Sequence, residues 1–245
     1  MAWTARRITS LAAAFACALP LPTNARAQDD APSEKEEAGI TAASFSGISA
    51  RGIGPALMSG RISDLAINAK RPGEYYVAVA CGGVWKTTNW GTTFKPVFDG
   101  QGSYSIGCVT IDPHNPSTVW VGTGENNSQR SVGYGDGVYK SVDGGASWTN
   151  MGLKDSGHIG MVRVHPDDPS TVYVAALGPL WSPAGDRGLY RTTDGGATWE
   201  KILEISENTG INEVHLDPRD PDVMYATAYQ RRRHVWTLVN GGPEG

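Results

Sequence analysis

Side chains capable of ligand binding or acid–base chemistry gather in three irregular segments of the chain. They are Glu125, Asn126 and Arg130 within 124–136, Trp181, Asp186 and Arg187 within 178–187, and Arg231 within 230–234. Arginine and tryptophan are among the side chains that most often anchor a bound partner. Two carboxylates that face each other across a cleft can instead hydrolyse a glycosidic bond, one as the acid and the other as base or nucleophile.

Each candidate also has a purely structural interpretation. Glu125 and Asn126 could satisfy backbone groups of their own long loop, and Trp181 could cover the end of a sheet. A run such as Arg231–Arg233 is most often solvated, although one of its members could pair with Glu125 or Asp186. The sequence leaves these alternatives open.

Several other chemistries lack the residues that they need. No C-x-x-C pair or histidine cluster offers a zinc site, no G-x-S-x-G elbow offers a serine nucleophile, and no glycine-rich loop carries the lysine of a phosphate site. The net charge of −4 disfavours nucleic acid, whose phosphates need a basic surface. We therefore expect no metal, no cofactor and no nucleic-acid partner.

The elements that must position the candidates form a repeat. Short apolar or alternating runs are separated by Gly, Pro, Asn and Asp, which is typical of strands and turns. Four runs share an isoleucine, at Ile62, Ile106, Ile159 and Ile211, spaced 44, 53 and 52 residues apart. Since a unit of this length holds four strands, the sequence predicts an all-β β-propeller with three complete four-stranded blades and a partial fourth.

Successive connections of a four-stranded meander alternate between the two ends of the strands. The proline-bracketed turns 112–117, 165–170 and 217–222 should therefore lie on one face, and the three irregular segments on the opposite face, which we call the long-loop face. Arg61 and His158, which directly precede two of the shared isoleucines, are expected at the mouth of the central channel on that face. Loops of variable length on a fixed scaffold commonly carry binding sites.

A second repeated feature, which we call the boxed turn, joins the third and fourth strands of a unit. It reads "TTNWGTTFK" at 87–95, "SVDGGASWT" at 141–149 and "TTDGGATWE" at 192–200. The aspartate can bond turn amides, a glycine can adopt positive φ, and the tryptophan can bury a large apolar area. We expect a structural role for Asp143, Gly145, Trp148, Asp194, Gly196 and Trp199.

The boxed turns resemble the Asp-box (BNR) repeat of sialidases, sortilins and related propellers, although Asn89 and Phe94 depart from the pattern in the first copy. From about residue 45 to residue 245 the chain is similar to large exported bacterial proteins with a sortilin-type propeller. This resemblance implies a binding or scaffolding module for a protein, peptide or glycan ligand on the long-loop face.

Enzymatic alternatives follow from other members of these propeller families. Xyloglucanase-type propellers carry one catalytic aspartate just before a Gly-Gly pair in the first blade, and Ala80 stands at the comparable position here. The "ARGIGP" stretch does not match the Arg-Ile-Pro motif of sialidases, but Glu125, Asp136 and Asp186 could form an unrelated carboxylate pair. A propeller associated with a protease domain elsewhere is a third class. Binding is the favoured interpretation and glycoside hydrolysis the alternative.

The N-terminal segment predicts export. Residues 1–27 combine Arg6 and Arg7 with a short apolar run and an A-x-A site ending at Ala27, the pattern of a cleaved signal peptide. Its removal takes away three arginines and no acid, so the net charge moves from −4 to −7. We expect a disordered lead-in over 28–43, the propeller over 44–245, no transmembrane segment, and a secreted or periplasmic location. A Cys81–Cys108 disulfide is compatible with export but not required by it.

The fourth unit reaches Gly245 without a boxed turn, which leads us to expect a longer protein. The stretch 44–54 is expected to be a strand that completes the last blade of the ring. Because an incomplete sheet leaves backbone groups unpaired, we also expect self-association through the edge of the fourth unit.

Overall fold

The computed structural model describes residues 41–47, 61–127 and 132–245. The chain divides into two units, Met1–Ser49 and Ala50–Gly245. In the first unit, Ala42–Phe45 form a short 3-10 helix, η1, because the Ser44 amide donates to the Thr41 carbonyl at 2.9 Å. The expected strand over 44–54 is therefore wrong at its start. Its remainder, the signal peptide and most of the lead-in lie outside the described residues.

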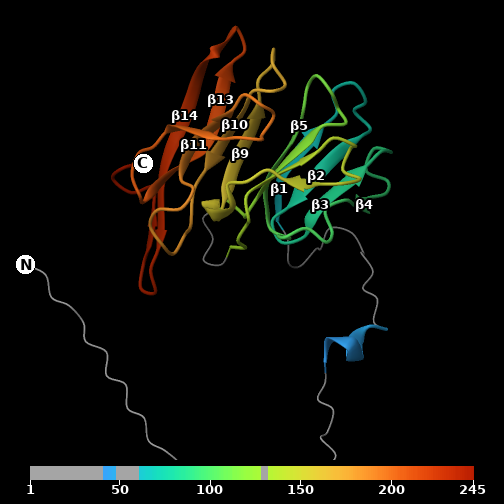
Figure 1. Ribbon diagram of the computed structural model, residues 1–245, viewed down its shortest axis with the longest axis horizontal. Helices are drawn as coiled ribbons and strands as arrows, with labels where there is room; N and C mark the ends of the chain where they lie inside the picture. Colours follow the sequence, from blue (N-terminus) through green and yellow to red (C-terminus); the bar gives the residue numbers. More distant parts are fainter. Residues whose placement is uncertain (1–40, 48–60, 128–131) are drawn as a thin grey trace, which may run out of the picture. The chain divides into compact units, whose positions relative to one another are not determined.

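The second unit consists of strands, apart from the 3-10 helix η2 (Lys154–Ser156). Three of its sheets are four-stranded antiparallel meanders and the last has three strands (Figure 1). The first blade contains β1 (Ile62–Ile67), β2 (Tyr75–Val79), β3 (Gly83–Thr87) and β4 (Lys95–Pro96). The second contains β5 (Ile106–Ile111), β6 (Val119–Thr123), β7 (Val138–Ser141) and β8 (Thr149–Asn150). The third contains β9 (Ile159–Val164), β10 (Val172–Ala176), β11 (Gly188–Thr192) and β12 (Glu200–Leu203). The fourth contains β13 (Thr209–Asp217), β14 (Asp220–Arg233) and β15 (Leu238–Asn240). The predicted partial β-propeller, with three complete blades and a partial fourth, is confirmed.

The blades pack face to face through alternate side chains of their second strands. Tyr76 and Ala78 of β2 meet Val119 and Val121 of β6 in one core, and none of the four is exposed to solvent. The next interfaces repeat the arrangement, with Trp120 packing in a core with Val172 and Val174, and Tyr173 in a core with Met224 and Ala226. Because strand side chains alternate between the two faces, a blade buried on both sides needs the nearly continuous apolar second strands that the sequence shows.

A β-bulge repeats directly after each of the four shared isoleucines. In the pairing of the first two strands of each sheet, the skipped residues are Ser63, Gly107, Gly160 and Asn212. A Cβ atom at Gly107 or Gly160 would overlap the backbone carbonyl of Ile159 or Asn212 in the following blade. The bulges therefore let the inner strands of neighbouring blades approach closely where they reach the long-loop face.

The boxed turns connect the third and fourth strands of their blades, as predicted. In the second blade, Asp143 Oδ1 accepts a hydrogen bond from the Ser147 amide at 2.8 Å. The indole of Trp148 then donates to the Val97 carbonyl of the preceding blade at 2.6 Å. The third blade repeats both contacts, with Trp199 as the anchor. The second and third boxed turns thus tie their own blades to the blade before them.

Backbone hydrogen bonds between neighbouring connections place those connections on two opposite faces, as expected. On the long-loop face, Gly83 donates to Tyr104 at 2.9 Å, Gly135 to Gly157 at 2.8 Å, and Ala184 to Glu207 at 2.7 Å. On the face of the boxed turns, Gly144 donates to Ser117 at 2.8 Å and Gly195 to Ser170 at 2.9 Å. The described parts of segments 124–136 and 178–187 therefore share the long-loop face.

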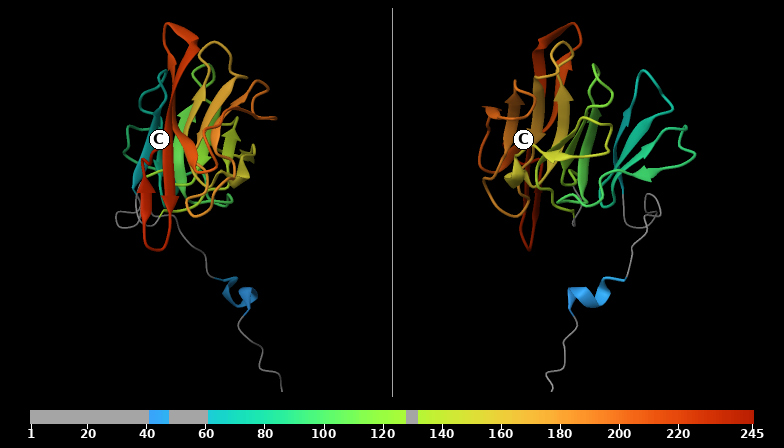
Figure 2. Two further views of the ribbon diagram at one scale, coloured as in Figure 1. Left: turned by 90° about the vertical axis from the view of Figure 1, so that its left-hand side faces the viewer. Right: turned by 45° about the vertical axis from the view of Figure 1, so that its right-hand side comes forward.

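The fourth sheet differs from its prediction. β14 continues to Arg233, so residues 230–233 form part of a strand instead of an irregular segment. Pairing of Arg231 with Asn240 and of Arg233 with Leu238 supplies the backbone bonds that extend it. Arg231 and Arg232 are only 2% and 8% exposed, so the expectation of a solvated arginine run is wrong. Figure 2 shows the β13–β14 turn reaching beyond the other sheets at one end and the β14–β15 turn reaching beyond them at the other.

In the parts of the chain that the structure describes, no helix is long and apolar enough to cross a membrane.

Candidate ligand-binding site on the long-loop face

Glu125 lies at the centre of a polar cluster on the long-loop face. Its side chain is fully buried, whereas that of its ion-pair partner Arg61 is 49% exposed. Arg61 Nε donates to Glu125 Oε1 at 2.6 Å, and the side-chain amide of Asn127 donates to the same oxygen. The structure therefore brings together two predicted site residues, Arg61 and Glu125, that are 64 positions apart in sequence.

Ser105, the residue before the shared Ile106, fixes the backbone around Glu125. The Glu125 amide donates to the Ser105 hydroxyl at 3.0 Å, and the Gly124 amide donates to the Ser105 carbonyl at 2.7 Å. This anchoring directs the Glu125 carboxylate to the first blade, where Oε2 lies 3.9 Å from the Cys81 thiol. Cys81 directly follows Ala80, the position at which xyloglucanase-type propellers carry a catalytic aspartate. The Glu125 carboxylate of the second blade therefore lies close to the position at which the first blade has no carboxylate.

The two cysteines of the described residues are free thiols and do not form a disulfide. Burial, followed by the neighbouring Glu125 carboxylate, raises the pKa of Cys81. Burial raises the pKa of Cys108 to about 12. Because the thiolate is the nucleophilic form, neither side chain is poised for nucleophilic chemistry near neutral pH.

A buried basic cluster, formed by His158, Arg187 and Arg231, lies beside the polar cluster. Arg187 donates to backbone carbonyls of its own loop, including that of Ser182 at 2.9 Å. Among the described residues, no side-chain nitrogen of Arg231 has a hydrogen-bond partner, and the ring nitrogens of His158 have only the Glu125 backbone beside them. Burial, followed by the charge of Arg231, lowers the pKa of His158 to about 3, so this imidazole is neutral. The ring of Tyr134 packs on it at a centroid distance of 5.0 Å.

Exposed aromatic side chains project from four different connections of the long-loop face. They are Tyr104, Tyr134, Trp181 and Trp236, which are 69%, 48%, 49% and 83% exposed. The Arg233 guanidinium lies 5.8 Å from the Trp181 ring centre, and His234 stacks on Trp236. Sequence reasoning identified only Trp181, although the other three also fall in connections that the strand order assigns to this face.

The remaining predicted residues have bonds that brace their loops. Asp186 accepts from the Asp155 amide at 3.0 Å, and Asp136 accepts from the Tyr139 hydroxyl at 2.6 Å. The Asn126 side chain donates to the Gly160 carbonyl at 3.2 Å, which joins the second blade to the third. Arg130 lies outside the described residues. Within the described ranges, no group of three His, Cys, Asp or Glu side chains could hold a metal ion.

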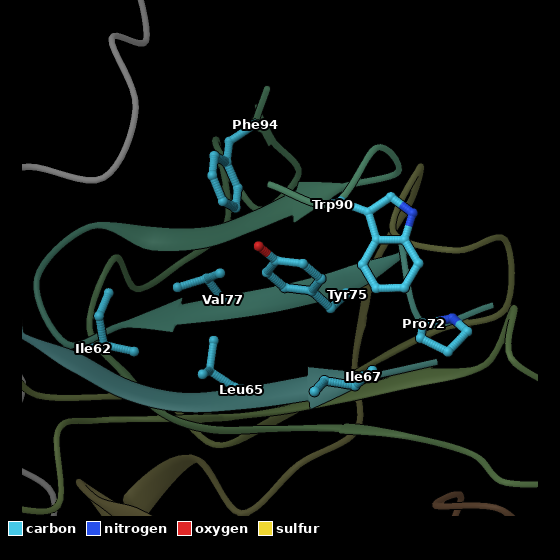
Figure 3. A pocket seen from close by; sticks show the side chains of 8 residues that line it. All are labelled: Ile62, Leu65, Ile67, Pro72, Tyr75, Val77, Trp90 and Phe94. Carbon is cyan, nitrogen blue, oxygen red and sulfur yellow. The ribbon is translucent and has the colours of Figure 1, made fainter. Parts of the chain in front are cut away.

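Two of the hollows among the described residues bear on ligand binding. One, of about 400 Å³, lies on the long-loop face and is lined by residues that include Tyr134, Lys154, Gly157 and Pro179. The other, of about 540 Å³, is an apolar groove on the outer side of the first blade, lined by Ile62, Leu65, Ile67, Pro72, Tyr75, Val77, Trp90 and Phe94 (Figure 3). Equivalent positions in the second and third blades are buried against the preceding blade.

Comparison with known sequences relates the chain to xyloglucanases. It is 24% identical over 174 residues to a xyloglucanase of Hypocrea jecorina, covering 66% of this chain and 20% of that protein. It is 23% identical over 218 residues to xyloglucanase Xgh74A of Acetivibrio thermocellus, covering 73% of this chain and 24% of that protein. The chain thus spans about a fifth to a quarter of these relatives. No protein-family profile matches it.

Solved structures give the same fold. An ancestral GH74 enzyme superposes with a TM-score of 0.55 at 20% identity, covering 69% of this chain and 22% of that one. The GH74 xyloglucanase from Xanthomonas campestris superposes with a TM-score of 0.50 at 18% identity, covering 73% and 28%. The solved structures thus show the β-propeller fold, and the curated relatives that the chain resembles are xyloglucanases.

Proposed function

We propose that this chain is a carbohydrate-directed β-propeller that binds a polysaccharide across its long-loop face. The observation that carries the proposal is the set of four exposed aromatic side chains on that face, one from each of four connections. Aromatic rings offer broad apolar surfaces to the C–H faces of sugar rings. The similarity to xyloglucanases supports a β-glucan ligand over the protein or peptide ligand that the sortilin resemblance implies.

Binding of xyloglucan, measured by isothermal titration calorimetry, tests this proposal. Replacing Trp181 and Trp236 together with alanine is expected to weaken binding at least tenfold, because two stacking platforms are lost. Trp90→Ala is the matched control, since Trp90 is 75% exposed but belongs to a boxed turn on the opposite face. Unchanged affinity in the Trp181/Trp236 variant, or an equal loss in the Trp90 variant, contradicts the assignment of the face.

Glycoside hydrolysis is the second candidate function, and the position of Glu125 favours it. A buried carboxylate beside Cys81 could supply one of the two acids that the reaction needs. Asp136 and Asp186, the other candidates for the second carboxylate, are both engaged in loop contacts. If the chain is a hydrolase, release of reducing ends from xyloglucan should be abolished in Glu125→Gln while binding persists. Release at the wild-type rate in that variant excludes Glu125 as the acid or base.

We also infer that the boxed turns are Asp-boxes and that the protein is exported. The bonds of Asp143 and Trp148 described above support the first inference, and the Arg6–Ala27 pattern supports the second. Cell fractionation of the full chain, followed by N-terminal sequencing, tests export. A mature protein that begins at Gln28 is the expected result.

A further inference from the structure

The buried basic cluster holds more hydrogen-bond donors than the described residues use. All three guanidinium nitrogens of Arg231 are shielded from solvent and have no partner among the described residues, and both ring nitrogens of His158 are shielded as well. An unpartnered buried cation is among the most costly arrangements in a protein, because its hydration is lost and nothing replaces it. Arg231 therefore requires an anionic or strongly accepting partner.

The surrounding charges do not supply that partner. Glu125 lies near enough to act on Arg231 electrostatically, but its carboxylate bonds Arg61 and Asn127. Arg187 and Arg232 add positive charge to the same region. The region is thus locally positive in a chain whose net charge is negative.

The hollow of about 400 Å³ on the long-loop face adjoins this cluster. Tyr134 and Gly157 line the hollow. Tyr134 packs on the His158 ring, and Gly157 directly precedes His158. Lys154, a further cation, lines the same hollow. Asp155 lines the hollow as well, so its rim carries one charge of each sign, and a ligand group that enters beside Tyr134 would approach the basic cluster.

We propose that the basic cluster of His158, Arg187 and Arg231 is a subsite for the carboxylate of an acidic sugar. This subsite rests on the proposed polysaccharide-binding function and gives it a substrate class, a glycan that contains uronic acid residues. A guanidinium can bond a carboxylate through two parallel N–H donors. The neutral His158 imidazole can donate one further hydrogen bond to the anion or to a sugar hydroxyl.

Calorimetric titration of the full chain with D-glucuronate, D-glucose and inorganic phosphate tests the subsite. We expect glucuronate to bind at least tenfold more tightly than either of the other two. Arg231→Gln should weaken glucuronate binding at least tenfold, whereas Arg219→Gln should not, because Arg219 is exposed on the opposite face and bonds Asp217. Equal binding of glucose, equal binding of phosphate, or full affinity in Arg231→Gln overturns the proposal.

A measurement on the wild-type chain covers the case in which Arg231→Gln does not fold. Glucuronate should shift the imidazole NMR signals of His158 and leave those of the exposed His215 unchanged. Shifts that are equal at both histidines, or absent at both, contradict the subsite. Binding of neutral xyloglucan is measured separately, so the subsite can fail while the proposed function stands, and the reverse.

Discussion

At the scale of single residues, His158 links the basic cluster to pH. Its pKa is about 3 in the folded chain, against 6.5 in a model peptide, mainly because it is buried. Between these two values the unfolded chain binds a proton that the folded chain does not. Stability should therefore fall as the pH is lowered from 6.5 towards 3, by about 2 kcal/mol at pH 5. Urea denaturation at pH 7 and pH 5 should show a smaller loss in His158→Phe, and an unaltered loss in the exposed control His215→Phe.

The Arg61–Glu125 ion pair leads to a second prediction for single residues, which concerns the free energy of unfolding. Arg61→Ala leaves a buried carboxylate without its cation, which is more damaging than losing the carboxylate itself. Because Arg61 is half exposed, water can replace part of its effect, and we expect a loss of about 2 kcal/mol. Glu125→Gln, which keeps an acceptor for Asn127, should cost less. Equal losses for the two variants in chemical denaturation contradict this expectation. Arg71→Ala serves as the control, because its partner Glu74 keeps a second cation in Lys86.

At the scale of elements, the boxed turns can be compared with one another, because the first has an asparagine where the others have an aspartate. Asn89 Oδ1 accepts from the Thr93 amide at 3.0 Å in the first turn, as Asp194 Oδ1 accepts from Thr198 at 2.9 Å in the third. Asp194→Asn should therefore preserve the fold, whereas Asp194→Ala should lower the melting temperature by a few degrees without changing ligand affinity. Hydroxyl donation, chiefly from Thr192 and then from Thr198, holds the pKa of Asp194 below its usual range. The carboxylate's contribution is present above pH 3.8 and is lost as the pH falls further.

The first boxed turn carries a strained residue. Trp90 has φ of 61°, where the equivalent Gly144 and Gly195 both have 71°. A side chain in this left-handed region costs roughly 1–2 kcal/mol, and Trp90 recovers little by burial because it is 75% exposed. Trp90→Gly should raise the free energy of unfolding by about 1 kcal/mol, and Gly195→Ala should lower it. A destabilised Trp90→Gly variant in a thermal melt would mean that the packing of this indole outweighs the strain.

The strands and turns were predictable because they repeat and because their chemistry is local. Aspartate, glycine and tryptophan at fixed offsets define each boxed turn, and apolar second strands define each blade. The extension of β14 was not predictable, since "QRRR" has no apolar period and forms a strand only because β15 supplies backbone partners. The burial of Arg231 and the approach of Glu125 to Cys81 depend on how separate blades pack together, which no local pattern encodes.

At the scale of the whole molecule, the two outer sheets present unequal faces. Leu65 and Ile67 of the first blade are 53% and 60% exposed. Their equivalents in the second blade, Val109 and Ile111, pack in the core with the preceding blade. Tyr225 of the fourth sheet is 64% exposed, although the equivalent aromatic residues of the earlier blades are buried against the next blade. The exposed face of the fourth sheet is thus of the kind that a following blade covers. The exposed face of the first blade is of the kind that packs on a preceding blade.

This complementarity sharpens the expected self-association of the chain. The Tyr225 face of one copy should pack on the Leu65 face of another, in a head-to-tail contact. Light scattering should then show concentration-dependent oligomers for the wild type, and monomers for Leu65→Lys and for Tyr225→Lys alone, because each variant blocks one half of the contact. An equimolar mixture of the two variants retains one intact face of each kind, so it should form a one-to-one dimer and nothing larger. Oligomers that persist in both single variants point instead to pairing along the β15 edge, for which Val239→Lys is the corresponding test. A wild-type chain that stays monomeric at all concentrations contradicts both contacts.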